Sequence, residues 1–332
     1  MNVKNKDTIK LLTRLFANYV RKHRLKLIIS IFCMVIVAGA TALNAWMMQP
    51  VLDEIFINKN QTLIVLIPIA VVIIAFFKGI ASYIQSIFMS YIGYKLVADI
   101  QHQMFRAAIR CDLSYHNEVN SGTILSRFIQ DVGALSRGVH NVIINIIKDS
   151  LTFIFLIGVM FYHDTKLAFL ALFVFPIVIY PIRLIGKRLR KISKNTQIGF
   201  GVLTSKLSES FSAIKTIKAF GSENFESRRI DKEIDNIFNL TYKSTKVNSI
   251  ARPLMEIVSG CAIGGIIFIG GSQVILGQTT PGTFFSFLTA LLMAYQPVKS
   301  LASLNATLQV AMASAERVFE ILDKKPLIKE TK

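Results

Sequence analysis

Long apolar runs are the feature that most constrains what this chain can fold into. Several stretches, such as 62–92, stay apolar over more than the roughly 20 residues that a helix needs to cross about 30 Å of hydrocarbon. The whole 332-residue chain is 52% hydrophobic and only 17% charged. The sequence therefore predicts an all-α, multi-pass membrane protein. Its six predicted transmembrane helices cover residues 25–50, 62–92, 141–162, 167–182, 253–272 and 283–305.

The basic residues lie on one side of these predicted spans. All but five of the 38 Lys and Arg residues fall near the N-terminus, in the segments 93–140 and 183–252, or after residue 305. Because Lys and Arg are enriched in cytoplasmic loops, we expect these segments and both termini to be cytoplasmic. The net charge of +18 thus has a membrane explanation, and we expect no nucleic-acid partner.

The two cytoplasmic connections, 93–140 and 183–252, are long and carry apolar residues at helical spacing with few glycines. This pattern predicts that membrane helices continue into the cytoplasm, turn and return. Half of the shorter excursion, if fully helical, would extend about 36 Å. Long cytoplasmic helical extensions of this kind hold something away from the membrane.

The N-terminal segment 7–23 predicts an amphipathic helix. It places Ile9, Leu12, Phe16 and Tyr19 on one face, with basic residues elsewhere. We expect this helix to lie in the cytoplasmic interface of the membrane, close to the first span.

Three lysines interrupt the predicted spans at similar depths. Counted from the external ends of their spans, Lys78, Lys148 and Lys299 lie roughly 24, 21 and 24 Å below the outer boundary. They either form a cationic ring facing a cavity that attracts phosphate, or each reaches the nearby cytoplasmic interface independently. Glu256 is expected at the same level and Asp149 follows Lys148, so either carboxylate can pair with a lysine and weaken its hold on an anion.

Several segments resemble the transmembrane domain of ABC exporters. "NSGTILSRFIQDV" (120–132) is similar to their first cytoplasmic loop and "SESFSAIKTIKAFGSENFE" (208–226) to their second. Residues 277–323 resemble their last span and its exit toward the ATPase domain. Within that family, "KGIASYIQSI", "LRKISKNTQ" and "PVKSLASLNA" look like the bacterial lipid A flippases.

The resemblance implies a six-helix half-transporter in the bacterial inner membrane, working as a homodimer or with a related half-transporter. It implies an amphipathic elbow helix and tail in 1–24, the transmembrane domain in 25–322 and the start of a linker to a nucleotide-binding domain in 323–332. The substrate it implies is lipid A or a related phosphorylated lipid, moved from the inner to the outer leaflet. The candidate substrate-binding residues are Lys78, Lys148, Lys299 and Glu256.

In this family, short coupling helices at the loop turns press into the ATPase domains. The resemblance carries that role onto 112–118 and 212–220. The residues concerned are Asp112, Tyr115, His116, Glu118, Ser212, Ile214, Lys215 and Phe220. The first turn reads Tyr115-His116-Asn117 where the family has two aromatic residues and Asp, so its aromatic anchor is reduced.

A phosphate-binding loop of the form G-x-x-x-x-G-K-[ST] is absent from the sequence, and the pair Gly186-Lys187 lacks the flanking residues of that motif. We therefore expect no ATP hydrolysis by this chain alone, and no catalytic, cofactor or metal site within it. ATP and Mg²⁺ would bind a nucleotide-binding domain that was trimmed, lost or supplied by another chain. Two alternatives stay open: export of a hydrophobic drug or another lipid by the same fold, and a non-transporting remnant.

Overall fold

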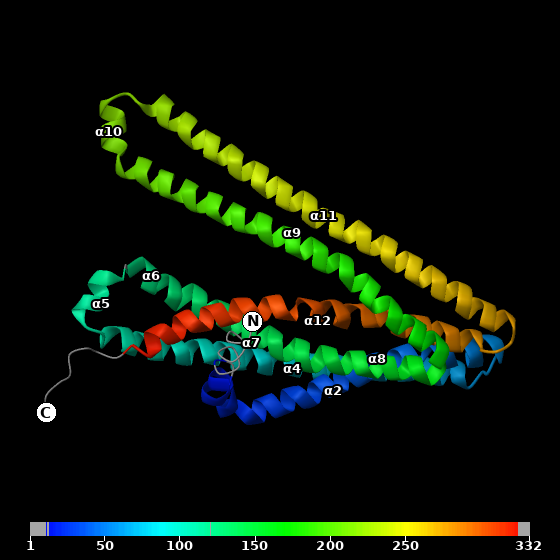
Figure 1. The fold of residues 1–332 in the computed structure, drawn as a ribbon. Helices are drawn as coiled ribbons and strands as arrows, with labels where there is room; N and C mark the ends of the chain where they lie inside the picture. The colour runs from blue at the N-terminus through cyan, green and yellow to red at the C-terminus, as the bar shows by residue number, and fades with distance from the viewer. Residues whose placement is uncertain (1–10, 12, 120, 325–332) are drawn as a thin grey trace. The chain divides into compact units, whose positions relative to one another are not determined.

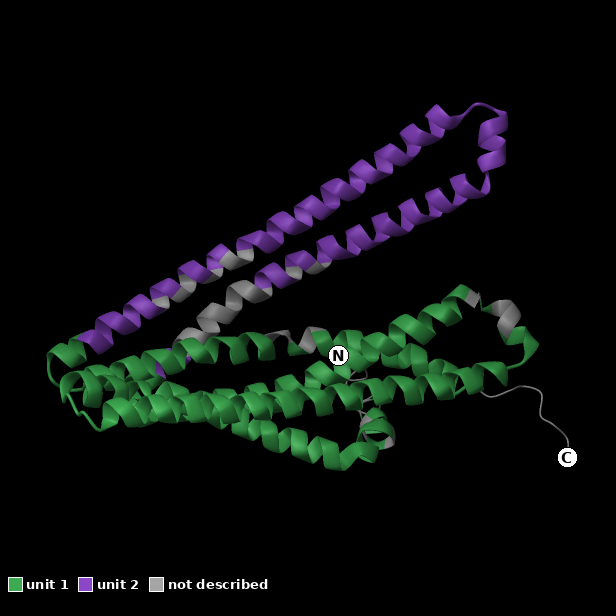
Figure 2. Cartoon of the chain, turned by 180° about the vertical axis from the view of Figure 1, so that it is seen from behind, with its two compact units in different colours: residues 1–168, 272–332 green, residues 169–271 purple. Residues whose placement is uncertain are grey.

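The computed structural model describes residues 11, 13–119 and 121–324, and all of the regular structure in this part of the chain is helical (Figure 1). The predicted all-α fold class is confirmed for these residues. The chain divides into two compact units (Figure 2). Unit 1 comprises residues 1–168 and 272–332, and unit 2 comprises residues 169–271.

Unit 1 holds most of the elements. Its first part contains the π-helical η1 (Phe16–Val20), the 3₁₀-helical η2 (Arg21–His23), α2 (Arg24–Trp46), α3 (Met48–Pro50), the π-helical η3 (Val51–Ile57) and α4 (Leu63–Ile109). Next come α5 (Leu113–Glu118), α6 (Ser121–Ser126), the π-helical η4 (Arg127–Asp131), α7 (Val132–Ile144), the π-helical η5 (Asn145–Asp149) and α8 (Ser150–His163). The long helix α12 (Pro281–Leu322) completes the unit.

The core of unit 1 lies among its long helices. Helix α2 packs against α4 and α8, while α12 packs against α7 and α8. Helices α7 and α12 approach closely at Gly138 and Ala311: a Cβ atom placed on Gly138 would overlap the Ala311 methyl group. Small residues at such positions let helix backbones approach closely, which is how helices associate where lipid removes the hydrophobic driving force.

Polar side chains fix the beginning of α12. The Asp53 carboxylate of η3 accepts a hydrogen bond from the Gly282 N–H at 2.9 Å and from the Thr280 hydroxyl at 2.5 Å. The Ser286 hydroxyl, fully buried, donates to the Ala45 carbonyl at 2.8 Å and lies 2.7 Å from His163 Nε2. These bonds join the start of α12 to the ends of α2 and α8, all at ends that the sequence predicts to be external.

Unit 2 is an antiparallel helical hairpin. It is built from α9 (Thr165–Ser212), the short helix α10 (Ile214–Ala219) and α11 (Glu223–Ile275), whose outer ends extend into unit 1. Salt bridges from α9 to α11 hold the hairpin together: Lys206 Nζ lies 2.6 Å from Glu233 Oε1, and Arg229 lies 2.9 Å from Glu209. These charged contacts suit the part of the hairpin that the sequence predicts to lie in the cytoplasm, 183–252.

Three helical stretches in the described part of the chain are long and apolar enough to cross a membrane: Arg21–Ile57, Leu63–Ile109 and Gly122–His163. They contain the first three predicted spans. The other three predicted spans lie within α9, α11 and α12, and their membrane crossing stays a prediction. Helix α4 continues to Ile109 without interruption, so the helical character predicted for the first excursion is confirmed there.

The N-terminal segment is helical but packs more deeply than its amphipathic pattern suggests. Leu15, Tyr19 and Val20 are buried in the core of unit 1, and the Tyr19 hydroxyl donates to Gln103 Oε1 at 2.7 Å. Leu15 is not among the residues of the predicted apolar face, yet it is buried in the α-helical turn that precedes the π-helical η1. Ile9 and Leu12, both on that predicted face, lie outside the described residues.

Candidate functional site

The three candidate substrate lysines lie on three different elements of unit 1. Lys78 is on α4, Lys148 on η5 and Lys299 on α12, at roughly 22, 22 and 27 Å from the helix ends at Leu63, His163 and Pro281. Lys78 is half-buried among exposed apolar neighbours, and Lys299 is exposed. Their common depth in the membrane and the shared cationic ring stay predictions.

Of the two carboxylates expected near these lysines, Asp149 is paired. Its Oδ1 lies 3.8 Å from Lys148 Nζ, and its side chain is largely buried at the start of α8. A buried carboxylate next to a lysine lowers the cost of keeping that lysine charged in an apolar setting. Glu256, the other candidate, is on α11 in unit 2 and its side chain is exposed.

The two long excursions both turn through a short helix. Helix α5 (Leu113–Glu118) occupies the first predicted coupling segment and α10 (Ile214–Ala219) the second. At the α10 turn, Ile214 and Phe220 are 46% and 78% exposed, and their role in contacting an ATPase domain stays a prediction. Ser212 and Lys215 are exposed beside them.

The first turn differs from the second. Tyr115 of α5 is 8% exposed, so it packs within its own chain, with Lys324 Nζ lying 5.5 Å from its ring. This burial raises the pKa of the Tyr115 hydroxyl. Leu113, at the start of α5, is the exposed apolar side chain there, and Asp112, the residue before it, is half-buried. The side chains of His116 and Glu118 lie outside the described residues.

The end of α12 is held by three ion pairs that the sequence did not predict, and we name this set the α12 clamp. Arg14 donates two hydrogen bonds of 2.6 Å to the Asp323 carboxylate. Arg127 of η4 lies 2.9 Å from Glu320. The third pair joins Asp131 of η4 to Arg317, whose Nε lies 2.8 Å from Asp131 Oδ2.

The clamp ties two distant parts of the chain to the end of α12. Arg14 also lies over the Phe319 ring, 4.1 Å from its centroid. The Asp131 side chain is only 13% exposed and accepts a further hydrogen bond from the Ser314 hydroxyl at 3.2 Å. The hydrogen bonds from Arg317 and Arg14 hold the pKa values of Asp131 and Asp323 below their ordinary range.

Both halves of the clamp lie in segments that the sequence singled out. Arg127 and Asp131 belong to 120–132. Their partners Glu320 and Arg317, and Asp323, the partner of Arg14, belong to 277–323. The complementary charges were a signal, but partners separated by up to 309 positions cannot be matched from one sequence.

Metal-binding residues do not gather in the part of the chain that the structure describes, where no group of three or more His, Cys, Asp or Glu side chains could hold an ion.

The family of this chain follows from a comparison with known proteins. The family model described as the ABC transporter transmembrane region matches residues 27–298. The chain belongs to this family. It is therefore a membrane protein and the membrane part of an ABC transporter, a class in which such domains pair with an ATPase domain and a second membrane domain.

Its relatives include named flippases. The chain is 40% identical over 92% of its length to an ATP-dependent lipid A-core flippase of Syntrophus aciditrophicus, covering 51% of that protein. It is 37% identical over 98% of its length to a protein of the same name from Desulfotalea psychrophila, covering 56% of it. An uncharacterized ABC transporter ATP-binding protein of Sinorhizobium fredii is 30% identical over 96% of the chain, which covers 54% of that relative. The chain thus spans about half the length of the curated relatives it matches.

Proposed function

We propose that this chain is the permease half of an ATP-driven exporter that moves a phosphorylated lipid, of the lipid A class, from the inner to the outer leaflet of the bacterial inner membrane. In this proposal six helices cross the membrane, both termini are cytoplasmic and two copies form the working unit. ATP and Mg²⁺ bind an ABC ATPase domain, and the chain itself hydrolyses nothing. The names of the first two relatives support the substrate class.

The observation that carries the proposal is the position of three cations within apolar helices. Lys78, Lys148 and Lys299 lie about 22–27 Å from the predicted external ends of their helices. A lipid in the inner leaflet has its phosphates near that depth, and a lysine in a low-dielectric cavity attracts phosphate more strongly than it does in water. The exposed apolar surface of α4 around Lys78 suits the acyl chains.

A binding comparison tests this substrate class. The purified chain is titrated with lipid A and with lipid A stripped of its phosphates, in the same detergent. Replacing Lys78, Lys148 and Lys299 together by Ala should weaken binding of the phosphorylated form at least tenfold, because charge-assisted hydrogen bonds contribute about 1.5–3 kcal/mol each. Binding of the stripped form should change little.

A charge-matched control separates the site from overall charge. The control replaces three exposed lysines of the hairpin by Ala: Lys191, Lys194 and Lys243. It should bind lipid A as the unmodified chain does. If the span variant also binds lipid A unchanged, the lysines do not read phosphate, and export of a hydrophobic drug or a neutral lipid becomes the better explanation.

We further propose that α5 and α10 transmit ATP binding to the spans, with the α12 clamp carrying the motion of the first excursion into α12. The exposed Phe220 supports a contact with the ATPase domain at the α10 turn. In a complex with an ABC ATPase domain, Phe220→Ala should abolish stimulation of ATP hydrolysis by lipid. Phe225→Ala, 70% exposed on the neighbouring helix α11, serves as the control and should leave that stimulation intact. Equal loss in both variants would show that the α10 turn has no special role.

A further inference from the structure

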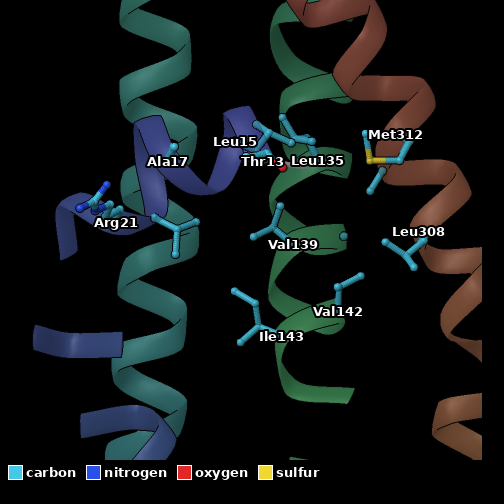
Figure 3. A pocket seen from close by; sticks show the side chains of 13 residues that line it. Thr13, Leu15, Ala17, Arg21, Leu135, Val139, Val142, Ile143, Leu308 and Met312 are labelled. Carbon is cyan, nitrogen blue, oxygen red and sulfur yellow. The ribbon is translucent and has the colours of Figure 1, made fainter. Parts of the chain in front are cut away.

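Unit 1 contains an apolar cavity that the proposed transport path does not use. It measures about 550 Å³ and lies between the N-terminal segment, α7 and α12 (Figure 3). That volume falls within the ~300–1,000 Å³ typical of small-ligand sites. Leu135, Val139 and Ile143 of α7 line one side of it, and Leu308 and Met312 of α12 another. None of the three candidate substrate lysines is among its lining residues.

Nearly all of the lining is apolar, with one charge at the edge. Among the described residues that line it, only Thr13 and Arg21 have polar side chains. Figure 3 shows Arg21 at the margin of the cavity, apart from the apolar side chains of α7 and α12. Arg21 is exposed and, among the described residues, has no ion-pair partner. Lys22 and Arg24, which follow it within one turn, are also exposed.

The position of the cavity restricts what can fill it. The apolar stretch that begins at Arg21 is long enough to cross a membrane, so the basic cluster of Arg21, Lys22 and Arg24 stands at one boundary of that stretch. The cavity lies at the cytoplasmic margin of the predicted spans: Val142 and Ile143 lie just inside the span 141–162, whereas Leu135, Val139, Leu308 and Met312 lie just outside the spans 141–162 and 283–305. A free phosphate ion at Arg21 would leave the apolar cavity empty. A lipid of the surrounding leaflet satisfies both parts, because its acyl chain matches the apolar lining and its charged head group reaches the cations.

We infer that this cavity binds one acyl chain of an anionic glycerophospholipid, with Arg21 contacting its phosphate. The lipid is a resident component and not the transported cargo, since its site is separate from Lys78, Lys148 and Lys299. The bound chain contacts the N-terminal segment, α7 and α12 together and so joins these three elements. Its occupancy stabilises unit 1 in membranes rich in anionic lipid.

Native mass spectrometry of the purified chain tests this site. The chain is titrated with phosphatidylglycerol and, separately, with phosphatidylcholine carrying the same acyl chains. We expect the first phosphatidylglycerol to bind more tightly than the first phosphatidylcholine. Arg21→Gln should weaken the phosphatidylglycerol complex about fivefold, the effect of roughly 1 kcal/mol per basic residue near anionic lipid. It should weaken the phosphatidylcholine complex less, because the choline cation of that lipid already compensates the charge of its phosphate. Arg228→Gln, at an exposed position on α11, is the matched control and should change neither.

A second variant tests the acyl-chain part of the site. Ala17 lines the cavity and is itself exposed, so Ala17→Trp places a large side chain at the opening without disturbing buried packing. It should weaken binding of both lipids, while the helical signal in circular dichroism stays unchanged. Equal retention of the two lipids by the unmodified chain, or an Arg21→Gln effect no larger than that of Arg228→Gln, would overturn the inference. The Arg21→Gln comparison decides even if Ala17→Trp folds poorly, because Arg21 is not part of the packed core.

Discussion

The close approach of α7 and α12 makes a sharp prediction about one methyl group. Gly138→Ala adds a Cβ atom that overlaps the Ala311 methyl and lies 3.3 Å from Ala311 Cα. Both contacts are with the body of a neighbouring helix and not with the end of a flexible chain, so the two helices must separate. Overpacking of this kind costs about 1–3 kcal/mol of unfolding free energy.

A second glycine isolates that packing cost. Gly158 lies in α8, and a Cβ atom there would meet nothing within 4 Å. Replacing either glycine by Ala gains the same helix propensity, up to about 1 kcal/mol, so that gain cancels when the two variants are compared. We expect Gly138→Ala to be about 1–3 kcal/mol less stable than Gly158→Ala.

The assay is reversible unfolding in mixed detergent micelles, followed by the fluorescence of Trp46, the single tryptophan of the chain. Ala311→Gly removes the overlapping methyl but costs about 1 kcal/mol of helix propensity, so the double variant should be more stable than the sum of the two single effects predicts. If Gly138→Ala and Gly158→Ala unfold at the same denaturant concentration, α7 and α12 do not approach each other as described.

Three further predictions concern polar contacts. The unfolding free energies of Asp131→Asn, Arg317→Gln and the double variant should give a coupling free energy of about 1 kcal/mol. This is below the range for fully buried pairs, because Arg317 is 46% exposed. If the effects of the two substitutions simply add, the ion pair of the clamp contributes nothing. Because the pKa of Asp131 is lowered in the fold, its carboxylate stabilises the fold at pH values above the ordinary aspartate pKa of about 3.9, and this stabilisation is lost as the pH falls through the lowered pKa. The difference in unfolding free energy between the unmodified chain and Asp131→Asn should therefore stay constant near pH 7 and close below about pH 4. Gly282→Ala places its Cβ 2.5 Å from the Asp53 carboxylate and should lower the unfolding free energy by about 1–2 kcal/mol, while Gly271→Ala, with open space around it, should not.

Periodicity and hydropathy were sufficient to predict most of the secondary structure. The apolar run at 62–92 lies within α4, and the apolar spacing of 184–220 lies within α9 and α10, because both signals depend on residues that are neighbours along one helix. Short helices at both turns were also expected, although from a resemblance and not from spacing.

Contacts between distant segments could not be predicted in the same way. The pairing of Arg14 with Asp323 depends on where two helices end in space, and the local sequence of neither segment contains that information. Likewise, Leu15 is buried because it packs against residues of distant helices, and the residues around it do not indicate those partners. The cavity between the N-terminal segment, α7 and α12 could not be predicted either, because its lining residues come from segments far apart in the sequence.

The most direct test of the central claim is the ATP-driven movement of lipid A across a bilayer. The chain, assembled with an ABC ATPase domain, is reconstituted into liposomes, and lipid A is followed from the leaflet facing ATP to the opposite one. The account predicts movement that requires ATP, that fails for lipid A stripped of its phosphates, and that is lost when Lys78, Lys148 and Lys299 are replaced by Ala. Equal movement of the phosphorylated and stripped lipids, or movement unaffected by the triple replacement, would contradict it.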